Sequence, residues 1–182
     1  MIRILLVGIF CFTGWLNAQN QNTFPDSWVG IWKGKLEIIT AKGTMQTVDK
    51  ELHIRKIDNE KAEDTLRKWT WKIVYRISKD STDERDYVLI EKDRAKGHYI
   101  MDEHNDILLD HYYIGGVLWS NFEVQGTRLT TISQIQGKKL IDEILYGPTE
   151  PVQTTGGTSE EIPPVKSFAI KGVQRTVMKK TK

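Results

Sequence analysis

The chain has 182 residues, with 26 lysines and arginines against 24 aspartates and glutamates, giving a formal net charge of +2. Because nucleic-acid and anionic-lipid binding rely on a strongly basic surface, this near-neutral balance leads us to expect neither partner. The single cysteine, Cys11, excludes an internal disulfide and a cysteine-bound metal centre, so a hydrophobic core must stabilise the fold.

Residues 1–19 have the layout of a secretory signal peptide. A short basic start is followed by an apolar run over residues 4–16 and then by Asn17-Ala18-Gln19. Cleavage just after Ala18 would export the protein to the periplasm or the medium, and we expect residues 20–182 to form a single domain. The apolar run is too short for a comfortable transmembrane helix and nothing later approaches that length, so we expect no transmembrane anchor.

Residues 28–39 predict the first strand of this domain. Strict alternation puts Trp28, Trp32 and Leu36 on one face and charged residues on the other. Gly30 and Gly34 leave space on the inner face, where a neighbouring backbone or a bulky ring can approach closely.

Runs rich in β-branched and aromatic residues recur along the rest of the chain and predict about ten strands in all. They lie near residues 28–40, 44–57, 66–78, 85–93, 97–103, 107–114, 117–125, 127–136, 138–146 and 165–178. Most connections have hairpin length, so consecutive strands should be antiparallel neighbours. An open meander would leave two long edges unpaired, and closure of the first strand on residues 165–178 removes both. The predicted fold is therefore all-β, a single antiparallel up-and-down β-barrel.

The motif Gly30-x-Trp32-x-Gly34 at the start of an all-strand chain resembles the opening of calycin-type barrels. These include lipocalins, fatty-acid-binding proteins and the nitrobindin-like group, and the last is nearest because it has ten strands and no helical lid. The resemblance implies that Trp32 closes one end of the barrel. Nitrobindin-like proteins hold haem through a histidine near the C-terminus, and no histidine follows His111 here, so we expect no cofactor.

The candidate ligand-binding residues are aromatic. Alternation along residues 67–77 sends Trp69, Trp71 and Tyr75 to one side, and with Trp32 and Trp119 they could line an interior pocket. A barrel of ten strands encloses more volume than one of eight, whose side chains already fill the interior. The alternative is that these rings simply fill the core.

Other chemistry has weaker support in the sequence. His98 and His111 flank the turn at residues 104–106 and, for some loop lengths, would share a face with each other and with Asp102. Two histidines without a third ligand make a poor site, so no metal is expected. The acidic turn 102–106 lacks the calcium-loop pattern, and no catalytic motif is present, so we do not expect an enzyme.

The sequence therefore predicts an exported lipocalin-like barrel that binds a small, mostly apolar or aromatic molecule in its interior. Residues 86–114 are apolar on both faces, for example at Leu108 and Leu109, which favours an alternative. In it the barrel is a non-catalytic envelope module that binds a protein partner through its outer surface.

The only long predicted loop spans residues 147–164 and contains four prolines and three glycines. With almost no apolar residues it should be mobile. Counting strands places it at the end of the barrel opposite the entry of the first strand, where we expect it to overhang the mouth and gate ligand exchange.

Overall fold

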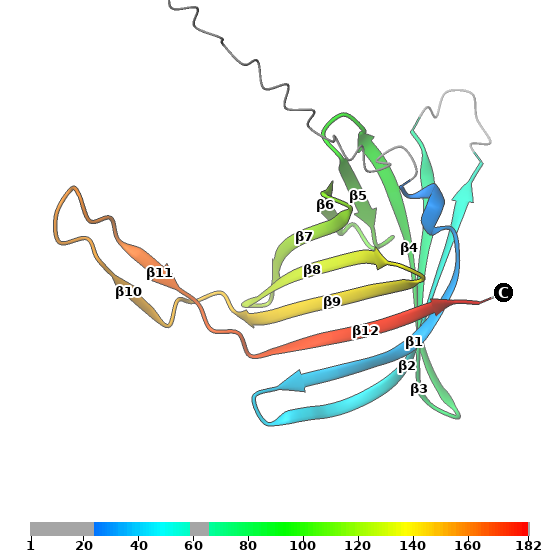
Figure 1. Cartoon of the computed structure of the whole chain (residues 1–182), viewed down its shortest axis with the longest axis horizontal. Helices are drawn as coiled ribbons and strands as arrows, with labels where there is room; N and C mark the ends of the chain where they lie inside the picture. Colours follow the sequence, from blue (N-terminus) through cyan, green and yellow to red (C-terminus); the bar gives the residue numbers. More distant parts are fainter. Residues whose placement is uncertain (1–23, 59–65, 182) are drawn as a thin grey trace, which may run out of the picture.

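A computed structural model describes residues 24–58 and 66–181. The expected signal peptide, residues 1–19, lies outside these described residues, as do residues 20–23. The described chain forms a closed barrel with the strand order β1-β12-β9-β8-β7-β6-β5-β4-β3-β2 (Figure 1). Among the described residues, no helix is both long and apolar enough to cross a membrane.

The barrel strands are β1 Gly30–Thr40, β2 Gly43–Ile57, β3 Lys68–Ser78, β4 Ser81–Asp93, β5 His98–Asp102, β6 Leu108–Ile114, β7 Val117–Val124, β8 Thr127–Gln136, β9 Lys139–Pro148 and β12 Gly172–Lys180. Every neighbouring pair is antiparallel, which confirms the predicted all-β up-and-down barrel. β1 and β12 close it, with a register that runs from Trp32 opposite Lys180 to Thr40 opposite Gly172. At Gly34 a Cβ atom would lie 2.3 Å from the Val177 carbonyl oxygen, so the close backbone approach expected there is present.

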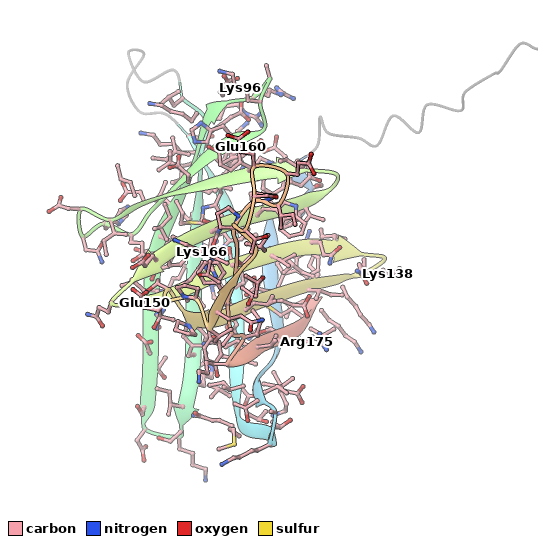
Figure 2. The ribbon with its side chains drawn as sticks, turned by 90° about the vertical axis from the view of Figure 1, so that its left-hand side faces the viewer. Lys96, Lys138, Glu150, Glu160, Lys166 and Arg175 are labelled. Carbon is pink, nitrogen blue, oxygen red and sulfur yellow. The ribbon has the colours of Figure 1, made fainter. Side chains whose placement is uncertain are left out.

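The segment between β9 and β12 differs from the prediction. Residues 165–178 are not one strand, because β11 Val165–Ser167 pairs with β10 Gln153–Thr155 in a separate two-stranded hairpin. The sequence predicted a mobile loop here, but residues 153–155 and 165–167 form backbone pairs with each other. Figure 1 shows the hairpin projecting beyond the barrel, and Figure 2, which looks toward the hairpin, labels Glu160 near its tip.

The base of this hairpin is fixed to the barrel rim. The Thr149 amide donates a hydrogen bond to the Gly126 carbonyl at 3.1 Å, and the Arg128 guanidinium lies 3.7 Å from the centre of the Phe168 ring. Gly126 belongs to the β7–β8 turn. The hairpin therefore rises from the end of the barrel that strand counting predicted.

The opposite end of the barrel is closed by the segment before β1. The short 3₁₀ helix η1, Asp26–Trp28, lies across this end, and its Trp28 carbonyl accepts a 2.8 Å hydrogen bond from the Trp32 indole N–H. Phe24 stacks on Tyr113 with ring centres 4.1 Å apart. The Trp69 indole N–H donates to Asp26 at 2.9 Å. Aromatic packing and polar contacts thus hold residues 24–28 in place as a plug at this end of the barrel. Trp32 lies at this closed end, as the family resemblance implied.

Candidate ligand-binding cavity

The barrel interior contains a cavity of about 680 Å³. Ile77 and Asp83 beside the β3–β4 turn, Ile107 in the β5–β6 turn and Val124 beside the β7–β8 turn all line it. The cavity therefore opens at the end opposite the plug, where the β10–β11 hairpin also begins. Residues 149–170, all of them described, contribute nothing to its lining, so gating by the hairpin stays a prediction.

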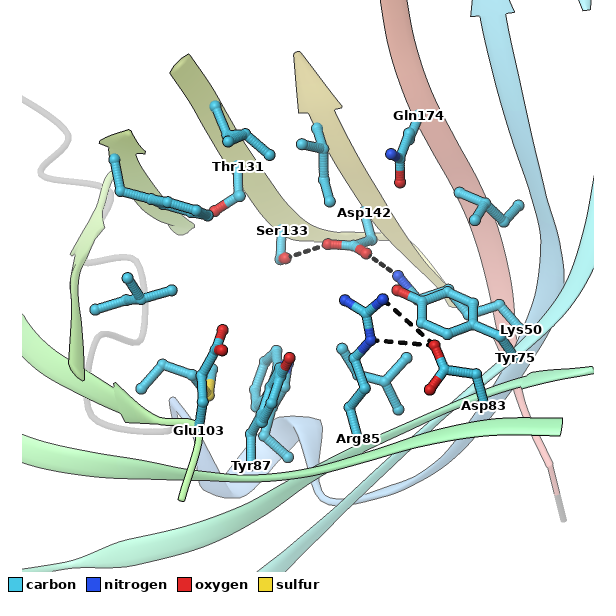
Figure 3. Close-up of a pocket in the computed structure, with 18 of the residues that line it drawn as sticks. Lys50, Tyr75, Asp83, Arg85, Tyr87, Glu103, Thr131, Ser133, Asp142 and Gln174 are labelled. Carbon is cyan, nitrogen blue, oxygen red and sulfur yellow. Dashed lines mark hydrogen bonds and ion pairs between the residues drawn. The ribbon is translucent and has the colours of Figure 1, made fainter. Parts of the chain in front are cut away.

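The lining is amphipathic. Its apolar part includes Leu36, Trp71, Leu109, Phe122, Leu129 and Ile144. Its polar part includes Lys50, Tyr75, Arg85, Tyr87, Glu103, His111, Ser133 and Asp142, most of them labelled in Figure 3. Ligand pockets commonly combine an apolar wall with a few placed polar groups, and this interior has both.

The predicted aromatic residues divide into three groups. Trp71 and Tyr75 line the cavity. Trp32 and Trp69 are 3 % and 0 % exposed and belong to the core at the closed end, outside the cavity lining. The placement of Trp119 in the interior is wrong, because Leu118 and Ser120 face inward on β7 and Trp119 is 39 % exposed on the outer face.

A charged pair lies on the inner wall. The Lys50 ammonium on β2 forms an ion pair with Asp142 on β9, and the Ser133 hydroxyl on β8 donates to the other oxygen of Asp142 at 2.6 Å. Burial alone would lower the pKa of Lys50, but Asp142 and the neighbouring Tyr75 outweigh it and raise the pKa above its ordinary value. Lys50 is therefore a fixed cation at neutral pH.

Arg85 on β4 brings a second cation to the same wall. Its Nε and one Nη atom each lie 3.3 Å from one oxygen of Asp83, and its guanidinium carbon lies 5.2 Å from the centre of the Tyr75 ring. Burial opposes the charged form, whereas Tyr75, Tyr87 and Asp83 favour it, and the pKa of Arg85 is raised overall. Figure 3 shows this guanidinium directed into the cavity.

His111 on β6 is the buried titratable ring of the lining. Its Nδ1–H donates to the Leu109 carbonyl at 3.1 Å, which fixes the neutral tautomer with Nε2 as an acceptor. Burial lowers the pKa of His111, and the hydrogen bond to Leu109 and the nearby Asp110 and Asp142 carboxylates only partly offset that effect. The ring is therefore neutral at neutral pH.

The open question of a histidine pair is settled by register. His98 lies opposite Tyr112 and Tyr99 lies opposite His111, so the two histidines occupy opposite faces of the sheet. The connection between β5 and β6 spans residues 103–107, an odd length that separates them. In the described ranges, no group of three or more metal-ligating His, Cys, Asp or Glu side chains occurs.

The outer face carries the apolar residues that the sequence placed on both sides of β6. Leu108, Tyr112 and Ile114 are 60 %, 41 % and 61 % exposed. Tyr112 stacks on His98, with ring centres 4.9 Å apart, and pairs with Trp119 across the strands. This surface is separate from the cavity.

Sequence reasoning missed the charged residues of the interior. Lys50 alternates in phase with Val48 and Leu52, and both of these are buried, so its inward register could be seen in the sequence. The inward positions of Asp142 and Arg85 can be recognised only once the strand pairing is known. Lys50, a charged residue at an inward position, was the one sign in the sequence of a polar cavity.

No protein-family model and no curated protein matches this sequence. The solved structure of the S-type phycobiliprotein lyase CPES from Guillardia theta matches the fold with a TM-score of 0.58 and 7 % sequence identity. The alignment covers 88 % of this chain and 93 % of that chain. At this identity the likeness shows the fold alone, a calycin-like barrel.

Proposed function

We propose that this protein is an exported calycin-like barrel that binds a small, largely apolar or aromatic molecule carrying a polar group. The observation that carries the proposal is the cavity of about 680 Å³ with charged and hydrogen-bonding groups inside it. Its volume lies within the range of about 300–1,000 Å³ typical of small-molecule sites. The fold shared with a protein named as a phycobiliprotein lyase is compatible with a ligand in the interior.

Export is proposed from the signal-peptide pattern of residues 1–19. N-terminal sequencing of the protein recovered from the periplasm or medium tests it. A new N-terminus after Ala18 is expected, whereas full-length protein retained in the cytoplasm would contradict export.

The two cations of the interior are suited to holding a ligand. Lys50 is kept as an ammonium by Asp142, so it lacks the free electron pair that a nucleophile or a base needs. Arg85 is likewise permanently charged. Both groups can hold a ligand, and neither can attack it at neutral pH.

Two adjacent threonines on β8 provide the test. Thr131 lines the cavity, and the neighbouring Thr130 faces the other side of the strand. The probe is 1-aminoanthracene, an uncharged fluorophore that brightens in apolar surroundings. Thr131→Trp should fill part of the cavity and weaken probe binding at least tenfold, while Thr130→Trp should leave it unchanged.

The outcome is decisive when both variants keep the parent far-ultraviolet circular dichroism spectrum. Equal binding by the parent and the Thr131→Trp variant would refute an interior site. If Thr131→Trp does not fold, Gln174→Trp, at another lining position on β12, makes the same test.

A second candidate function is favoured by the exposed outer surface of β6 and β7. Leu108, Tyr112, Ile114 and Trp119 are all more than a third exposed, and such apolar residues are typical of protein contacts. Replacing Tyr112 and Trp119 by serine would abolish a protein partner's binding in this case. The interior site would keep its affinity for the probe.

A further inference from the structure

A row of lysines crosses the outer face of three neighbouring strands. In the strand register Lys33 on β1 lies directly opposite Lys179 on β12, which lies directly opposite Lys139 on β9. The adjacent residues Met178 and Leu140 are fully buried, so Lys179 and Lys139 point outward. Like charges at directly opposed positions repel each other. Lys33, Lys139 and Lys179 are called the lysine row below.

The positive charge of the lysine row is only partly neutralised. Lys33 forms an ion pair with Glu51 at 3.1 Å. Within residues 24–58 and 66–181, neither Lys139 nor Lys179 forms an ion pair. Val177, two residues before Lys179 on the same face of β12, is 42 % exposed. This surface therefore combines unneutralised positive charge with an exposed apolar side chain.

The end of the β10–β11 hairpin carries the opposite charge. Glu160 and Glu161 are both exposed, and neither forms an ion pair with any residue that the structure describes. The next residue, Ile162, is 51 % exposed. Glu160, Glu161 and Ile162 are called the hairpin tip below. Two carboxylates beside an exposed isoleucine complement a row of ammonium groups beside an exposed valine.

The hairpin tip and the lysine row of one molecule lie too far apart to meet. The lysine row lies at the closed end of the barrel, where Lys33 follows Trp32 and Lys139 begins β9. The hairpin begins at the other end of β9, 10 residues and therefore about 30 Å away, and projects away from the barrel. Figure 1 shows the hairpin and the C-terminus beyond opposite ends of β12. A contact between the two surfaces therefore joins different molecules.

We propose that the hairpin tip of one copy of this chain docks on the lysine row of a second copy. The carboxylates of Glu160 and Glu161 pair with the lysine ammonium groups, and Ile162 packs against Val177. Because the two surfaces differ, the contact is heterologous, and it repeats from copy to copy as an open chain or a ring. It does not depend on the proposed interior binding.

The first test is sedimentation velocity of the purified protein at increasing protein concentration and two salt concentrations. The Debye length falls from about 10 Å at 0.1 M salt to about 3 Å at 1 M salt, so ion pairing at exposed sites is strongly screened at the higher concentration. The weight-average sedimentation coefficient should rise with protein concentration in 0.1 M NaCl. In 1 M NaCl it should stay at the value of the monomer.

Charge reversal tests which surfaces are in contact. The double variant Lys139→Glu/Lys179→Glu reverses two charges of the lysine row, and Glu160→Lys/Glu161→Lys reverses both charges of the hairpin tip. Each variant alone should associate at least about tenfold more weakly than the parent, because like charges then face each other. An equimolar mixture of the two variants should regain association, because each tip then meets a row of opposite charge. Both variants must keep the parent far-ultraviolet circular dichroism spectrum.

The matched control is Lys79→Glu/Lys92→Glu, which makes the same change of charge at exposed positions outside both surfaces. It should associate as the parent does, and a loss as large as that of the lysine-row variant would overturn the proposal. If a charge-reversal variant fails to fold, replacing residues 149–162 with a short Gly-Ser turn removes the hairpin tip and should abolish association.

Four results would overturn the docking of the tip on the row. The first is a parent that stays monomeric in 0.1 M NaCl. The second is association that persists in 1 M NaCl, which would point to the exposed apolar residues of β6 and β7 instead. The third is a mixture of the two variants that does not associate. The fourth is association lost in the lysine-row variant but retained in the hairpin-tip variant, because another acidic surface would then occupy the row.

Discussion

Lys50 and Asp142 can be replaced singly and together to measure what the interior ion pair contributes to stability. The Lys50 side chain is 3 % exposed and the Asp142 side chain 16 % exposed. Breaking a buried pair by removing one partner costs about 3–5 kcal/mol, because the other charge stays buried and uncompensated. Asp142→Leu leaves the more deeply buried charge, the Lys50 ammonium, without its partner. We therefore expect this variant to lower the free energy of unfolding by about 3–4 kcal/mol.

Lys50→Met should cost less, about 2 kcal/mol, because Asp142 keeps the Ser133 hydrogen bond and borders the cavity. The double variant removes both charges and should lie within about 1 kcal/mol of the parent. Urea unfolding at pH 7.5, followed by far-ultraviolet circular dichroism, measures all three. If the loss in the double variant equals the sum of the two single losses, Lys50 and Asp142 do not stabilise each other and the ion pair is refuted.

The outer pair Lys35 and Asp49 is the matched control. Their side chains are 68 % and 61 % exposed at a separation of 2.9 Å. Replacing either residue should change the free energy of unfolding by no more than about 0.5 kcal/mol. A loss as large as that at Lys50 would mean that burial is not the source of the effect.

Four smaller experiments test other parts of the structure. Trp32→Ala should lower the free energy of unfolding by about 3–5 kcal/mol, since it empties the closed end and removes the bond to Trp28, and a loss under about 1 kcal/mol would contradict that packing. A variant lacking residues 165–182 loses β12 and exposes the edges of β1 and β9, so we expect it to aggregate; soluble folded protein in size-exclusion chromatography would contradict closure. Burial alone would raise the pKa of Glu51, but hydrogen bonds from His53, Lys33 and Arg76 lower this pKa to about 2. The ionised Glu51 therefore stabilises the folded protein fully above about pH 4.5, and this stabilisation is lost as the pH falls toward 2. Glu51→Gln should therefore cost about 1–2 kcal/mol at pH 7 and progressively less in acid, and a pH-independent cost would contradict this. Replacing residues 149–162 with a short Gly-Ser turn should leave the melting temperature nearly unchanged. If the hairpin gates the mouth, the same variant should bind and release 1-aminoanthracene faster in stopped-flow measurements, and unaltered rates would exclude gating.

Local sequence patterns were sufficient for the fold. Alternation along β1 and β3 identified the inward faces, and hairpin-length turns implied antiparallel neighbours and closure. The β10–β11 hairpin escaped prediction because its pairing is made by backbone groups, in a segment whose side chains give no alternating apolar signal.

The candidate site was only partly predictable, for a physical reason. In a barrel with a filled core, the apolar face is the inner face, and this rule placed Trp71 and Tyr75 correctly in the cavity lining. Around a polar cavity the rule fails, because Ser120 faces inward while its neighbour Trp119 is exposed. The partner of Lys50 lies 92 residues away on β9, and only the closed barrel brings the two together.

Native mass spectrometry of the protein isolated from its own cellular compartment tests interior binding most directly. We predict a discrete extra mass from a non-covalent small molecule, which disappears under denaturing conditions. The Thr130→Trp variant should retain this mass and the cavity-filling Thr131→Trp variant should lose it. Detection of the bare polypeptide alone, or an extra mass equally retained by Thr131→Trp, would contradict a ligand held inside the barrel.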